Sequence, residues 1–212
     1  MKFAILPVTP YQQNCSLVWC EATGRGALID PGGDVELLLD AVARAGVSLE
    51  KLLLTHGHLD HVGGALELSR RLGLPIVGPH LDDAFLLESL PLQAEMFGFP
   101  PAEPFKPQQW LRDGDRVEVG ELNFAVIHCP GHTPGHVVLF EPASRHAFVG
   151  DVLFKGSIGR TDFPRGNYDD LIASIRNKLF PLGDDVAFIP GHGPMSSFGF
   201  ERRSNPFVGD AA

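Results

Sequence analysis

The chain is short of cysteine, of basic residues and of long apolar runs, and each shortage excludes a class of protein. Only three of its 212 residues are cysteine, too few for a secreted domain held together by disulfides. Its 26 acidic residues outnumber 17 basic ones, for a net charge of −9. This argues against a nucleic-acid partner, because clustered Lys and Arg neutralise phosphates. Without about 18 consecutive apolar residues, we expect no transmembrane helix and no membrane partner.

The N-terminus also lacks a secretory signal, because the apolar residues 3–8 are followed at once by polar ones. A cytoplasmic location is therefore expected, and the cysteines fit a reducing compartment. Cys15 and Cys20 flank a predicted strand that would hold their Cα atoms about 16 Å apart, whereas a disulfide needs about 7 Å. We interpret both, and Cys129, as small buried side chains.

What remains is an ordinary globular composition, with 44% hydrophobic and 20% charged residues. The length predicts a single domain, residues 1–212, with a sizeable core. Apolar patterns and turn residues predict strands at 3–8, 16–20, 26–29, 51–54, 75–77, 117–119, 122–127, 137–140, 146–149 and 186–189. Helices are expected at 34–45, 62–72, 82–97 with a break at Pro91, and 168–179. This order favours mixed sheets covered by helices over a doubly wound parallel sheet.

The most informative segment is His56-Gly57-His58-Leu59-Asp60-His61, which follows the predicted strand 51–54. It places three imidazoles and a carboxylate within six residues. Neutral imidazole and carboxylate are ligands that zinc and similar divalent metals prefer. The segment therefore predicts a metal site.

Three further candidate ligands follow later predicted strands. His132 lies in Pro-Gly-His-Thr, Asp151 in Gly-Asp and His192 in Pro-Gly-His-Gly. Each has a neighbouring glycine, which permits a close approach of the backbone to a ligand. The seven candidates His56, His58, Asp60, His61, His132, Asp151 and His192 are too many for one tetrahedral ion. They indicate two ions that share a bridging carboxylate.

These motifs resemble, in order and spacing, the signature of the metallo-β-lactamase superfamily, and within it the short bacterial glyoxalase II type hydrolases (hydroxyacylglutathione hydrolases). The similarity extends to Asn14-Cys15, Asp30-Pro31-Gly32-Gly33 and residues 159–164. The resemblance implies an α+β fold, an αββα sandwich of two mixed β-sheets flanked by helices, without the C-terminal helical domain of the long glyoxalase II enzymes. It also assigns His56, His58 and His132 to one metal, Asp60, His61 and His192 to the other, and Asp151 to both.

The activity that this resemblance implies is hydrolysis of a glutathione thioester such as S-D-lactoylglutathione, a small-molecule substrate. A hydroxide shared by two divalent ions, most simply zinc but with iron or manganese also suited, would attack the thioester carbonyl. Asp60 would orient that hydroxide. His136 is a candidate for holding a ligand by a hydrogen bond, with a structural histidine as the equal alternative. Arg160 stands where the long enzymes carry a glutathione-binding lysine, while Asp162 departs from their tyrosine.

Three other functions stay open at this point. A persulfide dioxygenase of the same fold uses one iron held by two His and an Asp, and has a similar Gly-Arg-Thr-Asp-Phe segment. A lactone or phosphoester hydrolase could use the same ligands. A non-catalytic binding module is disfavoured, because clustered polar ligands without a metal are costly.

Overall fold

The computed structural model describes residues 1–210, and its strands form two main sheets and one small hairpin. The first sheet has the spatial order β1 (Lys2–Val8), β2 (Gln13–Trp19), β3 (Arg25–Ile29), β4 (Ser48–Leu53), β5 (Ile76–Val77). The second has the order β13 (Ser196–Ser197), β12 (Ala187–Pro190), β9 (His146–Gly150), β8 (Val137–Glu141), β7 (Leu122–His128), β6 (Arg116–Val119). The hairpin pairs β10 (Leu153–Phe154) with β11 (Ser157–Ile158). Both main sheets contain parallel and antiparallel pairs.

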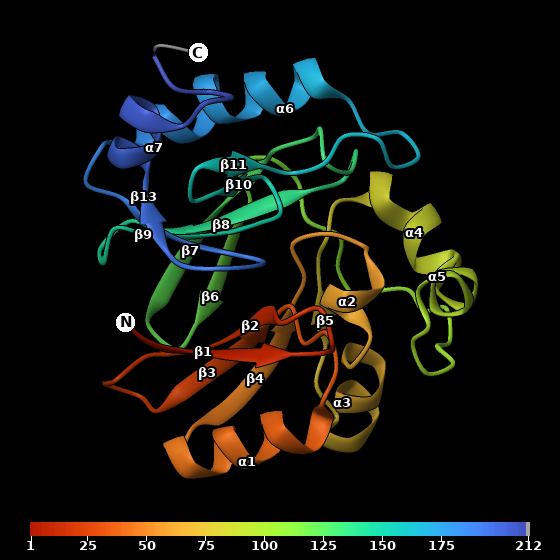
Figure 1. The fold of residues 1–212 in the computed structure, drawn as a ribbon. Coiled ribbons are helices and arrows are strands. Elements are labelled where there is room, and N and C mark those ends of the chain that lie inside the picture. The colour runs from red at the N-terminus through yellow and green to blue at the C-terminus, as the bar shows by residue number, and fades with distance from the viewer. Residues whose placement is uncertain (211–212) are drawn as a thin grey trace.

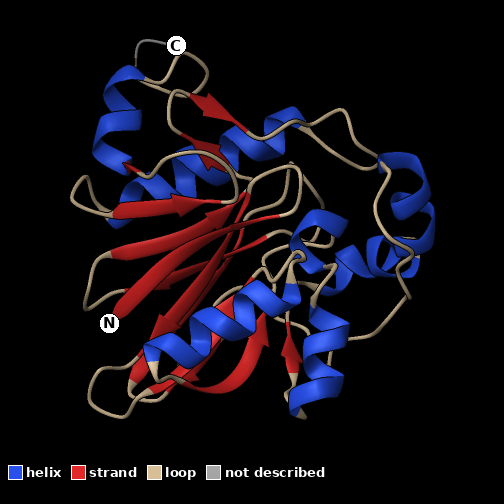
Figure 2. Cartoon of the chain, turned by 60° about the horizontal axis from the view of Figure 1, so that its bottom comes forward, coloured by secondary structure: helices blue, strands red, loops and turns tan. Residues whose placement is uncertain are grey.

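Helices cover the outer face of each sheet, which gives four layers (Figure 1). The helices of the first half are α1 (Val35–Ala45), α2 (Leu59–Val62), α3 (Ala65–Leu72), α4 (Ala84–Glu88) and α5 (Leu90–Phe97). Those of the second half are α6 (Tyr168–Ser174) and α7 (Phe198–Ser204). In the turned view, the stacked strands again lie between helices, which leave the strand ends near the N-terminus uncovered (Figure 2). None of the helices within residues 1–210 is both long and apolar enough to cross a bilayer.

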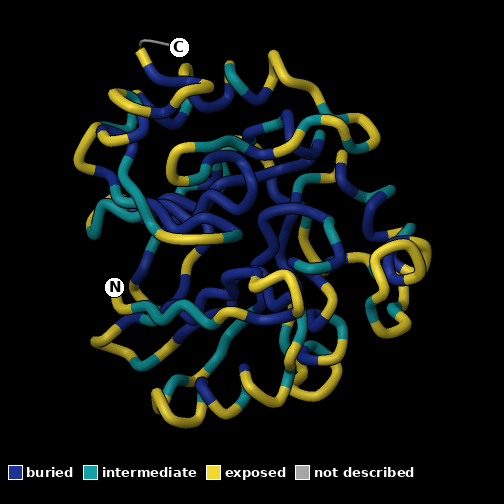
Figure 3. Tube along the Cα trace, viewed as in Figure 1, coloured by how far each residue is buried: buried dark blue, intermediate teal, exposed yellow. Residues whose placement is uncertain are grey.

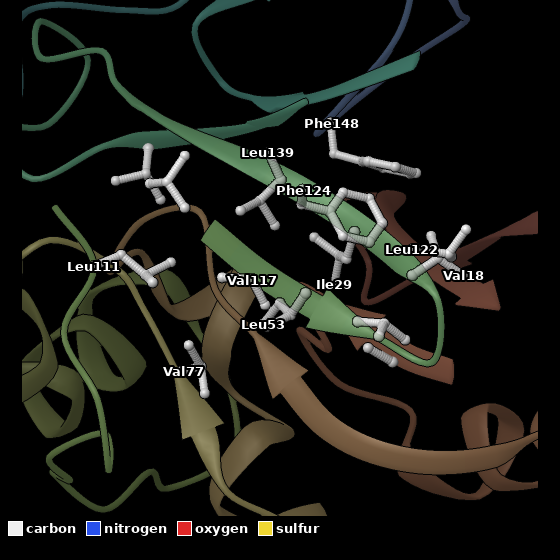
Figure 4. Close-up of a cluster of buried hydrophobic side chains, with 14 of the residues drawn as sticks. Val18, Ile29, Leu53, Val77, Leu111, Val117, Leu122, Phe124, Leu139 and Phe148 are labelled. Atoms are coloured by element: carbon white, nitrogen blue, oxygen red, sulfur yellow. The ribbon is translucent and has the colours of Figure 1, made fainter. Parts of the chain in front are cut away.

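The layering follows from alternation of side chains along the strands. Between the sheets lies a core that includes Val18, Ile29 and Leu53 from one side and Phe124 and Phe148 from the other (Figure 4). Their strand neighbours Leu17, Leu28 and Leu52 point the opposite way, toward α1 and α3. The outer face of the second sheet packs on α6 and α7. Buried residues are concentrated in the sheets and the loops between them (Figure 3). The predicted αββα sandwich is therefore confirmed.

Some predicted elements differ in detail. The helix expected at 62–72 begins only at Ala65, and Val62 is the last residue of the separate helix α2. Between the two helices, Gly64 donates its N–H to the Pro31 carbonyl (2.9 Å). Pro91 does not break the helix expected at 82–97. The break is at Ser89, and Pro91 occupies the first turn of α5, where a missing N–H costs little. The helix expected at 168–179 ends as a π-helical turn, Ile175–Leu179.

The chain also continues structurally beyond the strand predicted as its last. β13 and α7 follow it, and Ser197 caps α7 by accepting a hydrogen bond from the Phe200 N–H (3.2 Å). This serine was an available helix-start signal. The three cysteines are free and buried, as expected.

Candidate metal centre

The topology brings the predicted ligands to one edge of the two sheets. β3, β4 and β5 are parallel to each other, and so are β9 and β12. The segment 55–58 follows β4, Asp151 follows β9 and His192 follows β12. Asn14 on β2 connects the sheets, because its side-chain amide donates to the carbonyls of Pro190 (3.0 Å) and Gly193 (2.8 Å). Ligand-bearing loops from both sheets therefore meet at this edge.

Three imidazoles form the first group, His56, His58 and His132. The Nε2 atom of His56 lies 3.1 Å from His58 Nδ1, and the Nε2 atom of His132 lies 3.0 Å from the same atom. The outer nitrogens of two of these rings are occupied. His56 Nδ1 bonds to Thr55 Oγ1 (3.1 Å), and His132 Nδ1 donates to the Arg160 carbonyl (2.8 Å). The remaining ring nitrogens converge on one point.

The charge state of this group suits a metal ion. Burial lowers the pKa of His58 to about 3 and also lowers the pKa values of His56 and His132. All three rings are therefore neutral bases at pH 7. Neutral lone pairs that face each other at about 3 Å repel unless a proton or a cation lies between them. The arrangement fits a divalent ion held by three imidazoles.

The second group is Asp60, His61 and His192. The Nε2 atom of His192 lies 3.1 Å from Asp60 Oδ2, and the Nε2 atom of His61 lies 3.8 Å from it. Burial alone would lower the pKa values of both histidines. At His61 the charges of Asp151 and Asp60 outweigh burial and raise the pKa. At His192 the hydrogen bond to Asp60 outweighs burial and also raises the pKa. These carboxylates therefore favour positive charge at this point, which is what a metal ion supplies.

Asp151 lies between the two groups. Its Oδ1 atom is 3.4 Å from His61 Nε2, and its Oδ2 atom is 3.6 Å from His132 Nε2 and 3.7 Å from His192 Nε2. Burial would raise the pKa of Asp151, but the charge of His61 lowers it below the usual range. Asp151 Oδ1 and His61 Nε2 are buried without a hydrogen-bond partner among the described residues. Such unsatisfied atoms fit a bound ion.

Sequence reasoning missed two buried aspartates that hold these loops. Asp30 Oδ1 accepts a hydrogen bond from the Thr55 N–H (2.7 Å), and its Oδ2 accepts from Thr55 Oγ1 (2.6 Å) and bonds to His61 Nδ1 (2.9 Å). It therefore fixes His61 with Nε2 facing the centre. Asp30 belongs to a turn motif noted in the sequence, but that motif indicated no contact with His61.

The second missed residue is Asp83, which joins the two loops that carry the first group. Its Oδ2 accepts from the Gly57 N–H (2.9 Å) and Thr133 Oγ1 (2.8 Å), and its Oδ1 accepts from the Gly135 N–H (2.6 Å). Burial raises the pKa of Asp83 to about 6, although the hydrogen bond from Thr133 opposes it. No spacing in the sequence pointed to this residue, because its partners lie 26 to 52 positions away.

Two further candidates from the sequence, His136 and Arg160, lie beside the metal centre. His136 is buried, stacks on His56 at 4.7 Å between ring centroids and accepts a hydrogen bond from the Asp151 N–H (3.0 Å). His136 thus contacts the backbone of Asp151, not its carboxylate. Its predicted role in holding a ligand stays a proposal. Arg160 lies at the rim of the site, where its guanidinium pairs with Asp162 (2.9 and 2.8 Å) and covers the Phe163 ring. Its predicted contact with substrate also stays a proposal.

The backbone at Gly191 closely approaches two candidate ligands. A Cβ atom there would lie 2.1 Å from Asp151 Oδ1 and 2.6 Å from His61 Cε1. Gly191→Ala should displace both side chains and lower metal affinity by about 10- to 100-fold, measured by competition with a chromogenic chelator. Gly24→Ala is the control, because it places alanine at φ +66° with no atom within 4 Å. Equal metal affinity in both variants would contradict the packing argument.

An open pocket of about 810 Å³ leads to this centre. Its floor contains His58, Asp60, His132, Asp151 and His192. The walls are formed mainly by apolar side chains of α4, α5 and the loops that follow them, and by Phe154, Ile158 and Phe163. Two cations, Lys155 and Arg160, belong to the lining. The arrangement can admit an organic molecule and bring a polar bond of it to the floor.

Comparison with known proteins agrees with this geometry. Residues 8–192 match the family described as the metallo-beta-lactamase superfamily. The chain is 50% identical to the hydroxyacylglutathione hydrolase GloC of Haemophilus influenzae over 98% of both chains. Among solved structures, the BLEG-1 B3 metallo-beta-lactamase is 34% identical, with a TM-score of 0.90 over 98% of this chain and 99% of that one. TTHA1623, solved in a di-iron-bound form, is 38% identical, with a TM-score of 0.88 over 97% and 100%.

The resemblance stated from the motifs is thereby confirmed, and the His and Asp clusters of the site are those of a fold that binds divalent metals. The chain belongs to the metallo-beta-lactamase superfamily, in the group that includes the hydroxyacylglutathione hydrolase GloC.

Proposed function

We propose that this protein is a metal-dependent thioester hydrolase that cleaves S-D-lactoylglutathione or a related hydroxyacylglutathione to a hydroxy acid and glutathione. The observation that carries this proposal is the 50% identity to GloC over 98% of both chains. The geometry supports it, because two groups of donor atoms share Asp151 at the floor of a pocket large enough for such a substrate.

We also propose that the centre holds two divalent ions, with zinc as the first candidate. His56, His58 and His132 would hold one ion, Asp60, His61 and His192 the other, and Asp151 both. Imidazole and carboxylate donors suit zinc, iron and manganese alike. When bound, such ions polarise a carbonyl oxygen and lower the pKa of coordinated water.

The chain's own residues orient the reacting groups. Asp30 and the carbonyls of Tyr11 and Arg160 accept hydrogen bonds from the outer nitrogens of His61, His192 and His132. These bonds determine which nitrogen of each ring faces the centre. Burial would raise the pKa of Asp60, but His61 and His192 keep it low. The ionised Asp60 carboxylate is thus able to accept a hydrogen bond from the attacking water and orient it.

The thiolate leaving group explains why the reaction needs no residue that acts as a general acid. Thiols have a pKa near 8.5, so a thiolate departs near neutral pH without a dedicated general acid. Arg160 and Lys155 both line the pocket and offer cations for the carboxylates of glutathione. Arg160 is already paired with Asp162, so Lys155 is the stronger candidate for this contact.

A paired assay tests the proposal and its main alternative. The protein is stripped with a chelator, reloaded with Zn, Fe or Mn, and assayed for hydrolysis of S-D-lactoylglutathione and for oxygen uptake with glutathione persulfide. We expect thioester hydrolysis that is lost on stripping and restored on reloading, with about two metals per chain. Oxygen uptake by a form with one iron, without thioester hydrolysis, would instead identify a dioxygenase.

A further inference from the structure

The pocket has an apolar wall that a lactoyl group cannot cover. The wall consists of Leu92, Met96 and Phe97 on α5 together with Tyr11 and Phe99. In the free protein Leu92 is 57% exposed, Met96 67% and Phe97 43%. Large apolar side chains gathered at this exposure mark a binding surface. The only apolar substituent on the α-carbon of a lactoyl group is one methyl, which would leave most of this wall in water.

The wall is held in a fixed position relative to the metal centre. The buried face of α5 carries Gln93, whose Oε1 accepts a hydrogen bond from the N–H of Leu59, the residue before Asp60. At its other end the Tyr11 ring stacks on Phe99, with 5.3 Å between centroids and 1° between planes. The Tyr11 carbonyl accepts the hydrogen bond from His192 Nδ1 (3.2 Å). The wall is therefore connected to two candidate ligand segments.

Charge decides which part of the substrate meets the wall. Lys155 and Arg160 lie on and directly after the β10–β11 hairpin, which is a separate segment from α5 (Figure 1). The carboxylates of a glutathione moiety favour these cations. The thioester carbonyl has to reach the floor of the pocket, between these cations and the apolar wall. In that orientation the acyl substituent would extend toward Leu92 and Met96, which line the pocket.

We propose that this wall is a subsite for the acyl substituent and that the enzyme prefers thioesters with a bulky apolar acyl group, such as phenyl or branched alkyl, over lactoylglutathione. The inference rests on the proposed function and specifies its substrate class. Filling an apolar pocket commonly changes kcat/KM by 10-fold or more for each added group. S-D-mandeloylglutathione, which replaces the lactoyl methyl with phenyl, should therefore have a kcat/KM at least about 10-fold higher than S-D-lactoylglutathione.

The experiment compares both thioesters on the metal-loaded wild type, on Leu92→Ser/Met96→Ser and on Leu37→Ser. Leu37 is 44% exposed on α1 and does not line the pocket, so this control should keep the wild-type ratio of the two kcat/KM values. In the double variant the ratio should fall toward one. Because the substituted side chains are exposed, folding should be preserved, which a thermal melt checks.

The possible failures are distinguishable. Hydrolysis of lactoylglutathione without a preference for mandeloylglutathione, or a preference that survives in the double variant, overturns the subsite and leaves the proposed function intact. Hydrolysis of neither thioester overturns both. If the wall instead binds a second copy of the chain, sedimentation will depend on concentration in the wild type and not in the double variant, with an unchanged ratio; that result also overturns the subsite.

Discussion

Replacing Asp151 with Asn is expected to lower kcat/KM for the thioester by about 10²- to 10³-fold, the scale found when a group that stabilises the transition state is removed. Asn preserves the size of the side chain and removes its charge. Asp151 contacts His61, His132 and His192 at 3.4 to 3.7 Å, so the loss affects both groups of donors. The measurements are steady-state kinetics and metal content by mass spectrometry after gel filtration.

The metal content separates this role from a structural one. A carboxylate shared by two ions contributes to the affinity of each, so we expect Asp151→Asn to retain clearly fewer than two ions per chain. Asp185→Asn is the matched control, because Asp185 is exposed and pairs with Arg145. These two residues precede β12 and β9, at the ends of the strands that lie away from the metal centre. Two retained ions and a rate within tenfold of the wild type would refute the bridging role.

The candidate site was readable in the sequence because its residue types are diagnostic even without a structure. His56, His58, Asp60 and His61 lie within six positions, and the other three candidates each have a neighbouring glycine after a predicted strand. The division into two groups came from the resemblance and not from spacing. The structure brings His56, His58 and His132 together, and likewise Asp60, His61 and His192. The roles of these residues and of Asp151 as ligands are what Asp151→Asn and Gly191→Ala test.

The residues that support the site could not be read in the same way. Asp83 follows Asp82 at the start of a predicted helix, where two acidic residues are ordinary. The alternation of apolar residues predicted most strands, because it depends only on neighbouring positions. The contacts of Asp83 with Gly57 and Gly135 depend on how distant loops meet. The same holds for the wall on α5, because only the folded structure shows that Leu92 and Met96 remain exposed beside the site.

Replacing Asp83 with Ala should weaken metal binding at the first group by about 10- to 100-fold, as expected when a residue that positions ligands is lost. Asp83 connects the loop of His56 and His58 to the loop of His132 through three hydrogen bonds. Without it, the N–H groups of Gly57 and Gly135 lose their acceptor. The measurement is a titration of the stripped protein with zinc against a competing chelator.

Asp82→Ala is the control for this change, because Asp82 is the exposed neighbour in sequence and its carboxylate lies near His80 Nδ1 (3.4 Å). The stripped Asp83→Ala protein should also lose about 2 kcal/mol of unfolding free energy at pH 7. Leaving buried donors unsatisfied costs free energy. Part of this loss is offset, because alanine removes the cost of burying the Asp83 charge. Asp82→Ala should stay within about 0.5 kcal/mol of the wild type. If Asp83→Ala matches Asp82→Ala in zinc affinity and in unfolding free energy, the two ligand loops are held together without the Asp83 carboxylate.

The pH dependence of this stability difference follows from the pKa of Asp83. Burial raises that pKa from 3.8 to about 6, so the folded state binds the proton more tightly than the unfolded state. Stability from this group is therefore fully present below pH 4 and is lost as pH rises through about 6. The gap between the stripped wild type and Asp83→Ala should accordingly be wider at pH 4 than at pH 7, by up to about 3 kcal/mol for a shift of about two pH units. Urea unfolding at both pH values measures it. Because all other titrating groups are common to both proteins, a gap that widens toward pH 7 would mean that the three hydrogen bonds outweigh burial and hold Asp83 ionised.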